Sequence, residues 1–260
     1  MSLKLNEISE FLSFAKKLVS LSEQIIKKNS PQKLKINFKY DKSPVTKIDT
    51  AIEKKLRSLI QKKYPDHGIY GEEFENKKLD SSYVWVIDPI DGTKNFINGN
   101  GSYGTLISLC KDGYPVFGII NSPDIKKRWI GIKDNGAYCN GVKIKKSSLD
   151  LPLKDLFFST SGMTAFKSIN KNRKYNALTK KTKYVSLGGD CVQYGLLAEK
   201  RIPLVVESFL KPFDYLPLIN IIEESGGIIT DWKGNPLNFK SDGDVVACVS
   251  KKAHKQFLKI

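Results

Sequence analysis

The sequence predicts a mixed α/β protein with helices and an antiparallel sheet in its first half and alternating strands and helices in its second. Three observations support this fold class. Two amphipathic helical patterns open the chain, strand patterns joined by Asp-Gly and Asn-Gly turns follow from residue 84, and strand-helix alternation begins near residue 150. The composition, 40% hydrophobic and 27% charged, is that of a packed globular protein and excludes disordered and low-complexity classes.

The opening segment, residues 1–28, places apolar side chains at helical spacing and acidic side chains on the opposite face. This pattern differs from a signal or transit peptide, and we expect an ordinary amphipathic helix of a cytoplasmic protein. A loop is expected over residues 40–46, followed by a second helical pattern from Ile48 to Ile60 that Pro65 stops. The apolar stretches are too short to span a bilayer, so no membrane helix is expected.

The strand patterns of the first half lie at 84–87, 105–110, 116–121 and 129–133. Asp112-Gly113 and Asn135-Gly136 are typical of tight hairpin turns. In the second half we expect strands near 156–159, 184–187 and 203–206, and helices near 163–180, 191–199 and 215–225. These patterns predict two halves, 1–150 and 151–260, and the absence of a flexible linker predicts that they pack as one rigid body.

The net charge of +16 comes from 43 basic and 27 acidic residues, and only four of the basic residues are arginines. Nucleic-acid-binding faces usually concentrate arginine among aromatic residues, whereas these lysines are spread along the chain. Residues 167–183 are denser, with seven basic residues and no acid. We interpret this segment as a solvated face, with nucleic-acid binding or long-range attraction of anionic substrates as the alternatives.

Scarce histidines and scattered cysteines exclude several kinds of active site. The four cysteines form no CxxC pair, there are only two histidines, and Walker, GxGxxG and Cx5R motifs are absent. Redox chemistry, zinc sites and a Ser-His-Asp triad are therefore not indicated. Carboxylates are the remaining candidates.

The sharpest local motif is WVIDPIDGTK at residues 85–94, where an apolar strand pattern ends in Asp88 and Asp91. Two aspartates three residues apart on a tight turn can point at one spot, although Asp-Pro and Asp-Gly are also common in plain turns. Upstream, Gly71-Glu72-Glu73 brings a further acid off a short strand.

Two more acids lie at predicted helix starts. Asp214 follows Lys211-Pro212-Phe213 and precedes a helical pattern, and Asp49 ends the segment SPVTKID. Either could be a helix cap, and cap and ligand roles are compatible.

Together these motifs resemble the inositol monophosphatase-like family of metal-dependent phosphatases, whose marks are GEE, WxxDPxDGT, and an aromatic-Asp pair before a helix and Gly-Gly. The resemblance runs from residue 43 to residue 227. It implies alternating helix and sheet layers, αβαβα, with a metal cleft between the halves, and usually a homodimer.

The resemblance also implies roles for individual residues. The implied metal ligands are Glu72, Asp88, Asp91, Asp214 and the Ile90 carbonyl, with Asp49 as an outer ligand of a further metal. Thr93 would orient the attacking water, Glu72 and Asp49 would share in catalysis through the metals, and Asp91, Gly92 and Thr93 would contact the substrate phosphate. Converging carboxylates repel one another unless cations neutralise them, and an all-oxygen set favours Mg²⁺, here two or three ions that would activate a water for in-line attack on phosphorus.

Residues 188–214 carry the clue to the substrate. GGDCVQYGLLA, LVVE and LKPFD resemble the histidinol-phosphatase branch of the family, and Asp190 and Glu207 would suit a leaving group bearing an ammonium and an imidazole. A bisphosphate would instead need Lys or Arg for its second phosphate. We therefore expect a small phosphate monoester, histidinol phosphate, as the substrate.

Alternatives remain for the substrate and for single residues. An inositol or other polyol phosphate, then adenosine 3',5'-bisphosphate, are the substrate alternatives, and a non-catalytic RNA-associated role is the alternative from another class. Asp190 could be a helix N-cap, Glu207 a surface acid at a strand end, and Cys191 and Tyr194 packing residues. The branch tends to have Gly-Arg-Pro where this chain has Gly99-Asn100-Gly101, and Gly189 and Val192 also depart from the branch pattern.

Overall fold

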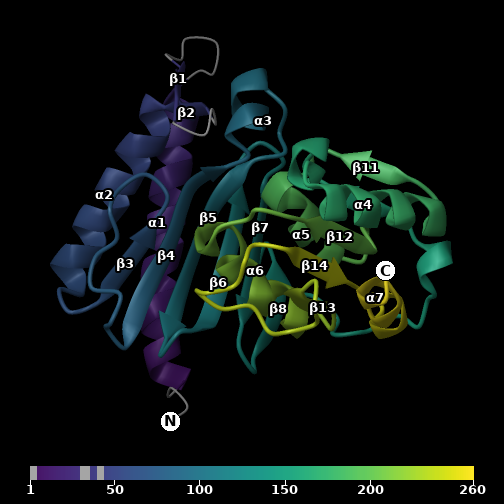
Figure 1. Cartoon of the computed structure of the whole chain (residues 1–260). Coiled ribbons are helices and arrows are strands. Elements are labelled where there is room, and N and C mark those ends of the chain that lie inside the picture. The colour runs from purple at the N-terminus through teal and green to yellow at the C-terminus, as the bar shows by residue number, and fades with distance from the viewer. Residues whose placement is uncertain (1–4, 30–35, 40–43) are drawn as a thin grey trace.

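The computed structural model describes residues 5–29, 36–39 and 44–260, and its elements stack in layers (Figure 1). The two predicted N-terminal helices are confirmed as α1 (Leu5–Lys28) and α2 (Lys47–Lys63). The predicted loop at 40–46 is wrong for its last three residues, and its first four lie outside the described residues. Those three form β2 (Pro44–Thr46), which pairs antiparallel with β1 (Ile36–Phe38), a hairpin too short to leave a period-two pattern.

The first sheet has seven strands. Their order is β3 (Gly68–Gly71), β4 (Tyr83–Asp91), β5 (Gly104–Lys111), β6 (Tyr114–Ser122), β7 (Lys127–Ile132), β8 (Gly136–Cys139) and β9 (Val142–Lys143). All neighbours are antiparallel except β3 and β4, which are parallel. The predicted turns at Asp112-Gly113 and Asn135-Gly136 join β5 to β6 and β7 to β8, as expected. The short β8–β9 hairpin was not predicted.

The second sheet has five strands and mixed pairing. Its order is β11 (Val185–Leu187), β10 (Phe158–Thr160), β12 (Leu204–Glu207), β14 (Val245–Cys248) and β13 (Ile228–Asp231). The helices of this half are α4 (Ile169–Lys181), α5 (Asp190–Ala198), α6 (Pro212–Glu224) and α7 (Lys251–Leu258), with 3₁₀ turns η2 (Leu153–Asp155) and η3 (Met163–Phe166). The predicted helix over 163–180 is split between η3 and α4, because Ser168 caps a new helix by accepting from Lys171 N.

Three hydrophobic cores separate the layers. One, around Trp85, lies between the seven-stranded sheet and the pair α1 and α2. A second, around Trp129, joins the other face of that sheet to α5, α6 and the second sheet, and a third, around Phe158, lies under α4 and α7. The αβαβα layering is thereby confirmed. The helix α6 packs so closely on the first sheet that a Cβ at Gly118 would lie 1.8 Å from the Pro217 carbonyl oxygen.

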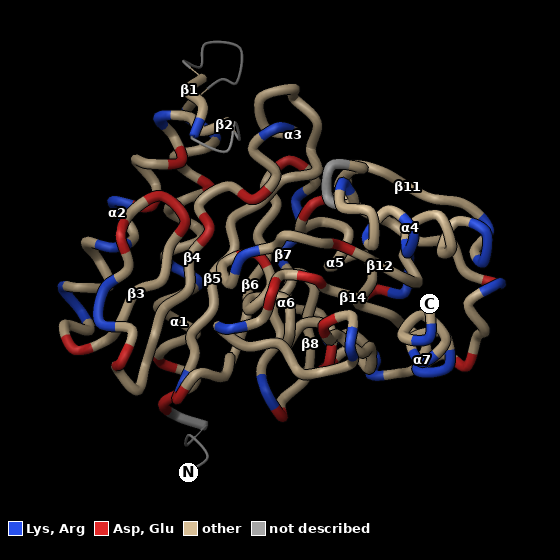
Figure 2. The backbone as a smooth tube through the Cα atoms, viewed as in Figure 1, with Lys and Arg blue, Asp and Glu red and all other residues tan. Residues whose placement is uncertain are grey.

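The basic residues are distributed over most elements (Figure 2). Within the dense segment 167–183 most basic side chains are exposed, as predicted, but two are not. Lys171 lies 3.7 Å from the centre of the Phe209 ring and binds Asp244 Oδ1 at 2.6 Å, and Lys174 lies 4.5 Å from the Phe257 ring. The solvated-face prediction is therefore incomplete, because these lysine stems and ammonium groups cover aromatic rings.

No helix in the described ranges is long and apolar enough to cross a membrane.

Candidate active site

Three aspartates converge where β4 ends. One carboxylate oxygen from each of Asp88, Asp91 and Asp214 lies within 4.8 Å of the others. The pairing of β4 with β5 is irregular between Asp88 and Asp91, and Thr105 Oγ1 donates to the Pro89 carbonyl at 2.9 Å, which fixes the turn between them. This acidic cluster, Asp88, Asp91 and Asp214, contains three of the acids that the resemblance assigns to the metal, and Glu72 is not among the residues that lie this close together.

The backbone of two helices holds two members of the acidic cluster. Asp214 is the third residue of α6 and accepts from Lys211 N at 2.6 Å. Its N-cap alternative is wrong, because Lys211 occupies that position, but one of its oxygens does bind the backbone of the helix start. Asp91 Oδ2 accepts from Cys191 N at 2.5 Å, at the start of α5. Asp88 Oδ1 is buried and has no hydrogen-bond partner among the described residues.

The acidic cluster carries an excess of negative charge. Burial raises the pKa of Asp214 to about 7, against the hydrogen bond from Lys211, and the nearby charge of Glu72 adds to the effect. Burial and then neighbouring carboxylates raise the pKa of Asp88 and of Asp91 well above the usual range. In the described parts of the chain no Lys or Arg forms an ion pair with any of the three. Unpaired oxygen donors of this kind fit a hard cation such as Mg²⁺.

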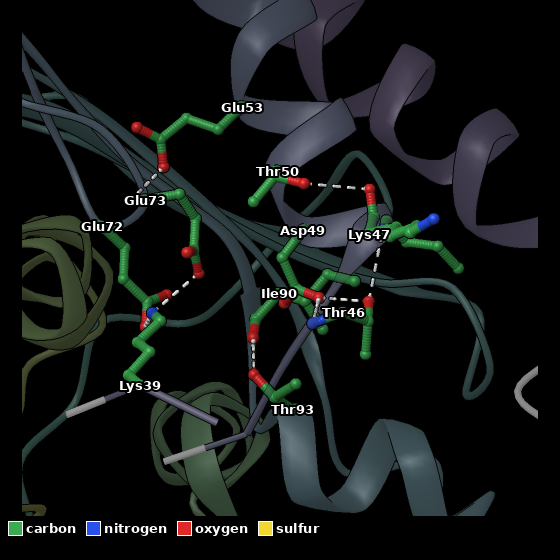
Figure 3. Close-up of polar contacts among 11 residues, drawn as sticks. Lys39, Thr46, Lys47, Asp49, Thr50, Glu53, Glu72, Glu73, Ile90 and Thr93 are labelled. Carbon is green, nitrogen blue, oxygen red and sulfur yellow. Dashed lines mark hydrogen bonds and ion pairs between the residues drawn. The ribbon is translucent and has the colours of Figure 1, made fainter. Parts of the chain in front are cut away.

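Glu72 and Glu73 follow β3, and both form ion pairs with the same lysine, Lys39. Lys39 Nζ donates to Glu72 Oε1 at 2.7 Å and to Glu73 Oε1 at 2.8 Å (Figure 3). Burial alone would lower the pKa of Lys39, but the carboxylates of Glu72 and Glu73 raise it by more. Burial raises the pKa of Glu73 to about 7. Lys39 could not be predicted from the sequence, since it is one lysine among many.

A buried ion pair on α2 fixes the Glu72 loop. Glu53 accepts from Arg57 Nε at 2.7 Å and from Glu73 N at 2.8 Å, and Arg57 donates to the carbonyls of Phe74 and Glu75 at 2.9 Å. These residues were missed by sequence reasoning. They could have been predicted, because Glu53 and Arg57 carry opposite charges four residues apart and each directly follows a buried apolar residue of α2.

Asp49 belongs to α2 and lies apart from the acidic cluster. Its Oδ2 accepts from Thr46 N at 2.9 Å and from the Thr46 hydroxyl, forming a capping box, while its buried Oδ1 has no partner among the described residues (Figure 3). Burial raises the pKa of Asp49. Asp49 therefore caps a helix and keeps one oxygen for another ligand.

The DGT turn leads into the short helix α3 (Thr93–Asn98). Thr93 Oγ1 donates to the Ile90 carbonyl at 3.0 Å (Figure 3). Gly92 has a φ of +81°, and a Cβ there would lie 2.8 Å from the Ser102 carbonyl oxygen, so only glycine fits. The turn thus presents Gly92 and Thr93 beside Asp91, as the motif predicted.

A cavity of about 620 Å³ opens next to the acidic cluster. Its described ionisable lining residues are Asp91, Lys94, Asp190, Cys191, Tyr194, Glu207 and Asp214. Asp190 is the first residue of α5, with a φ of +37°, and accepts from Asn95 Nδ2 at 2.5 Å. The N-cap alternative for Asp190 is wrong, because Gly189 occupies that position and Asp190 turns toward α3 instead.

Glu207 ends β12 and is 2% exposed, so its alternative as a surface acid is wrong. It accepts from Thr160 Oγ1 at 3.2 Å, Ser161 N at 2.6 Å, Ser161 Oγ at 2.8 Å and Gln193 Nε2 at 2.6 Å. Burial raises its pKa to about 7. Cys191 and Tyr194 are buried, as expected of packing residues, and both also line the cavity.

The fold and the acidic cluster beside this cavity define a metal-dependent phosphomonoesterase. A model of the inositol monophosphatase family matches residues 7–260. The chain is 39% identical over 243 residues to the Bifunctional phosphatase IMPL2, chloroplastic, of Arabidopsis thaliana, covering 93% of this chain and 70% of that protein. It is 32% identical to the histidinol-phosphatase of Chlorobaculum parvum, covering 82% of each.

Among solved structures, an inositol monophosphatase from Zymomonas mobilis superposes with a TM-score of 0.86 at 37% identity, over 96% of this chain and 97% of that one. The chain belongs to the inositol monophosphatase family and is a phosphoric monoester hydrolase.

Proposed function

We propose that this protein is a Mg²⁺-dependent histidinol-phosphate phosphatase. The observation that carries the proposal is the placement of Asp190 and Glu207 on the same cavity as the acidic cluster. Two carboxylates beyond the metal set favour a leaving group with positive charge. The relative named histidinol-phosphatase supports the same substrate class.

The proposed ligands of Mg²⁺ are Asp88, Asp91 and Asp214 with the Ile90 carbonyl, joined by Glu72 and, for a further ion, by the free Oδ1 of Asp49. Two or three ions are proposed. Bound Mg²⁺ would lower the pKa of a water and neutralise charge on the phosphate.

The chain's own residues then orient the reactants. The Thr93 proton is directed to the Ile90 carbonyl, so a lone pair of Thr93 Oγ1 can accept a hydrogen bond from the attacking water and orient its oxygen toward phosphorus. The amides of Gly92 and Thr93, in the turn that starts α3, are proposed to hold the phosphate oxygens.

The cavity's charge argues against bisphosphate substrates. Lys94, the one basic residue among its described lining residues, is exposed, whereas a second phosphate calls for a cluster of Lys or Arg. A neutral polyol phosphate is the second candidate, since the chain lacks the branch's arginine at 99–101 and resembles a solved inositol monophosphatase.

The test compares kcat/KM for histidinol phosphate, inositol 1-phosphate and adenosine 3',5'-bisphosphate in Mg²⁺. A preference of about a hundredfold or more for histidinol phosphate, equivalent to about 2.7 kcal/mol, is expected. A flat profile, or a preference for inositol 1-phosphate, would contradict the proposal.

A homodimer, a cytoplasmic location and a division into halves near residue 150 stay predictions from the sequence. The RNA-associated alternative predicts a steeply salt-dependent affinity for RNA that persists in Glu72→Gln. The phosphatase proposal predicts that this variant loses activity instead.

A further inference from the structure

Tyr194 lies in the wall of the substrate cavity, and its hydroxyl is buried. It lies on α5 four residues after Asp190, one turn further along the same helix face, and both residues line the cavity. The Tyr194 side chain is 2% exposed. Its Oη has no hydrogen-bond partner within the described part of the chain.

Two other buried tyrosines of this protein have hydrogen-bond partners. Tyr103 donates to Asp124 Oδ1 at 2.6 Å, and Tyr215 donates to the Asn238 carbonyl at 2.8 Å. Leaving a buried hydroxyl unpaired is costly, and folded proteins avoid it unless the group has another use. A phenylalanine would fill the same space without that cost.

The surroundings of Tyr194 indicate what kind of group it would bind. Burial and then the charges of Glu207, Asp91, Asp214 and Asp190 raise its pKa, so the phenol stays neutral and its oxygen lies in a negative field. A donor that carries positive charge is stabilised by such a field, whereas a second anion is repelled.

Asp190 and Glu207 line the same cavity. The four donors to Glu207 come from Thr160, Ser161 and Gln193, and none comes from Tyr194. The Tyr194 hydroxyl is therefore not paired with Glu207 in the described structure. Two carboxylates and a phenol oxygen together form an acceptor set for the N–H groups of an ammonium or imidazolium ion.

We propose that Tyr194 is a specificity-determining residue whose hydroxyl oxygen accepts a hydrogen bond from the cationic nitrogen of the leaving group, between Asp190 and Glu207. The proposal rests on the proposed function for its substrate class. It assigns a binding role to a residue that the sequence predicted only to pack.

The test measures two quantities in Tyr194→Phe and in the wild type: kcat/KM for histidinol phosphate relative to inositol 1-phosphate, and the inhibition constant of histidinol, the product. Tyr175→Phe is the matched control, because Tyr175 is buried in the core under α4 and does not line the cavity. Thermal unfolding of each variant separates a binding role from a structural one.

In Tyr194→Phe we expect the histidinol inhibition constant to rise about tenfold and the substrate preference to fall by a similar factor, with the melting temperature unchanged or higher. Tyr175→Phe should change neither constant. An unchanged inhibition constant in Tyr194→Phe, or a lowered melting temperature that accounts for the loss, would overturn the inference.

The two proposals fail separately. If the wild type prefers histidinol phosphate and Tyr194→Phe keeps that preference and the inhibition constant, the proposed function stands and the role of Tyr194 is refuted. If the wild type shows no preference but histidinol binding still weakens tenfold in Tyr194→Phe, the proposed substrate is refuted and the cation-binding role of Tyr194 stands. If neither effect is seen, both proposals are refuted.

Discussion

The acidic cluster and Glu207 lie beside one cavity, and the protein supplies them with very different numbers of hydrogen-bond donors. Glu207 accepts four hydrogen bonds from the chain. In the acidic cluster Asp91 and Asp214 each accept one backbone amide, and Asp88 Oδ1 accepts none from the described residues. Burial raises the pKa of acids in both regions.

The difference indicates that the acidic cluster and Glu207 have different roles. A carboxylate fixed by four donors is in place before any ligand arrives, whereas carboxylates that face one another with at most one backbone donor each need cations to be stable in their charged form. The acidic cluster is thus suited to hold a metal ion, whereas Glu207 is a fixed part of the cavity wall.

The largest effect expected from this contrast is the loss of turnover in Asp88→Asn. The amide cannot carry the negative charge that a divalent cation needs, so we expect phosphate release in Mg²⁺ to fall by more than about a thousandfold, or 4 kcal/mol. The fold should persist, because Asp88 Oδ1 makes no hydrogen bond in the described structure. Asp155→Asn, at an exposed acid in η2, is the control, and near-normal activity in Asp88→Asn would refute the metal assignment.

Arg57→Met tests the scaffold that positions Glu72. Glu53 would be left as a lone buried charge, so the free energy of unfolding should fall by about 3–5 kcal/mol, measured by urea denaturation. The double variant Glu53→Gln/Arg57→Met should recover part of that loss, because no charge is then unpaired. A loss below about 1 kcal/mol in Arg57→Met would show that this ion pair does not support the loop.

Mg²⁺ should stabilise the protein in a pH-dependent way. The pKa of Asp214 is about 7 in the folded protein against 3.8 ordinarily, so its contribution to stability is complete below about pH 3.8 and is lost as the pH rises through 7. Mg²⁺ at about 100 times its Kd should restore about 2.7 kcal/mol, or roughly 5–10 °C in Tm, at pH 8, and less at pH 5.5. Equal shifts at both pH values, or the same shift in Asp88→Asn, would contradict metal binding at the acidic cluster.

The parts of the fold and of the acidic cluster that depend only on residues close together in the sequence could be predicted. Asp88 and Asp91 are three residues apart on one turn, and the strong helix and hairpin patterns of the first half need no distant partner. Strands β13 and β14 and helix α7 were not predicted, since short apolar runs such as 245–248 become strands only beside β12.

The supporting contacts of the site could not be predicted for the same physical reason. Lys39 meets Glu72 across 33 residues, and Asn95 meets Asp190 across 95, so only the folded chain brings them together. Asp190 was expected to be either a cap or a substrate ligand, and its positive φ and its bond to Asn95 exclude the cap.

The most direct test of separate roles for the acidic cluster and the cavity wall is the specificity of Asp190→Asn. It is measured as kcat/KM for histidinol phosphate and for inositol 1-phosphate in Mg²⁺. If the acidic cluster catalyses and the cavity wall selects, histidinol phosphate should lose about 10- to 100-fold, or 1.4–2.7 kcal/mol, while inositol 1-phosphate changes little. An equal loss for both substrates would contradict it, because Asp190 would then support catalysis in general and not the choice of leaving group.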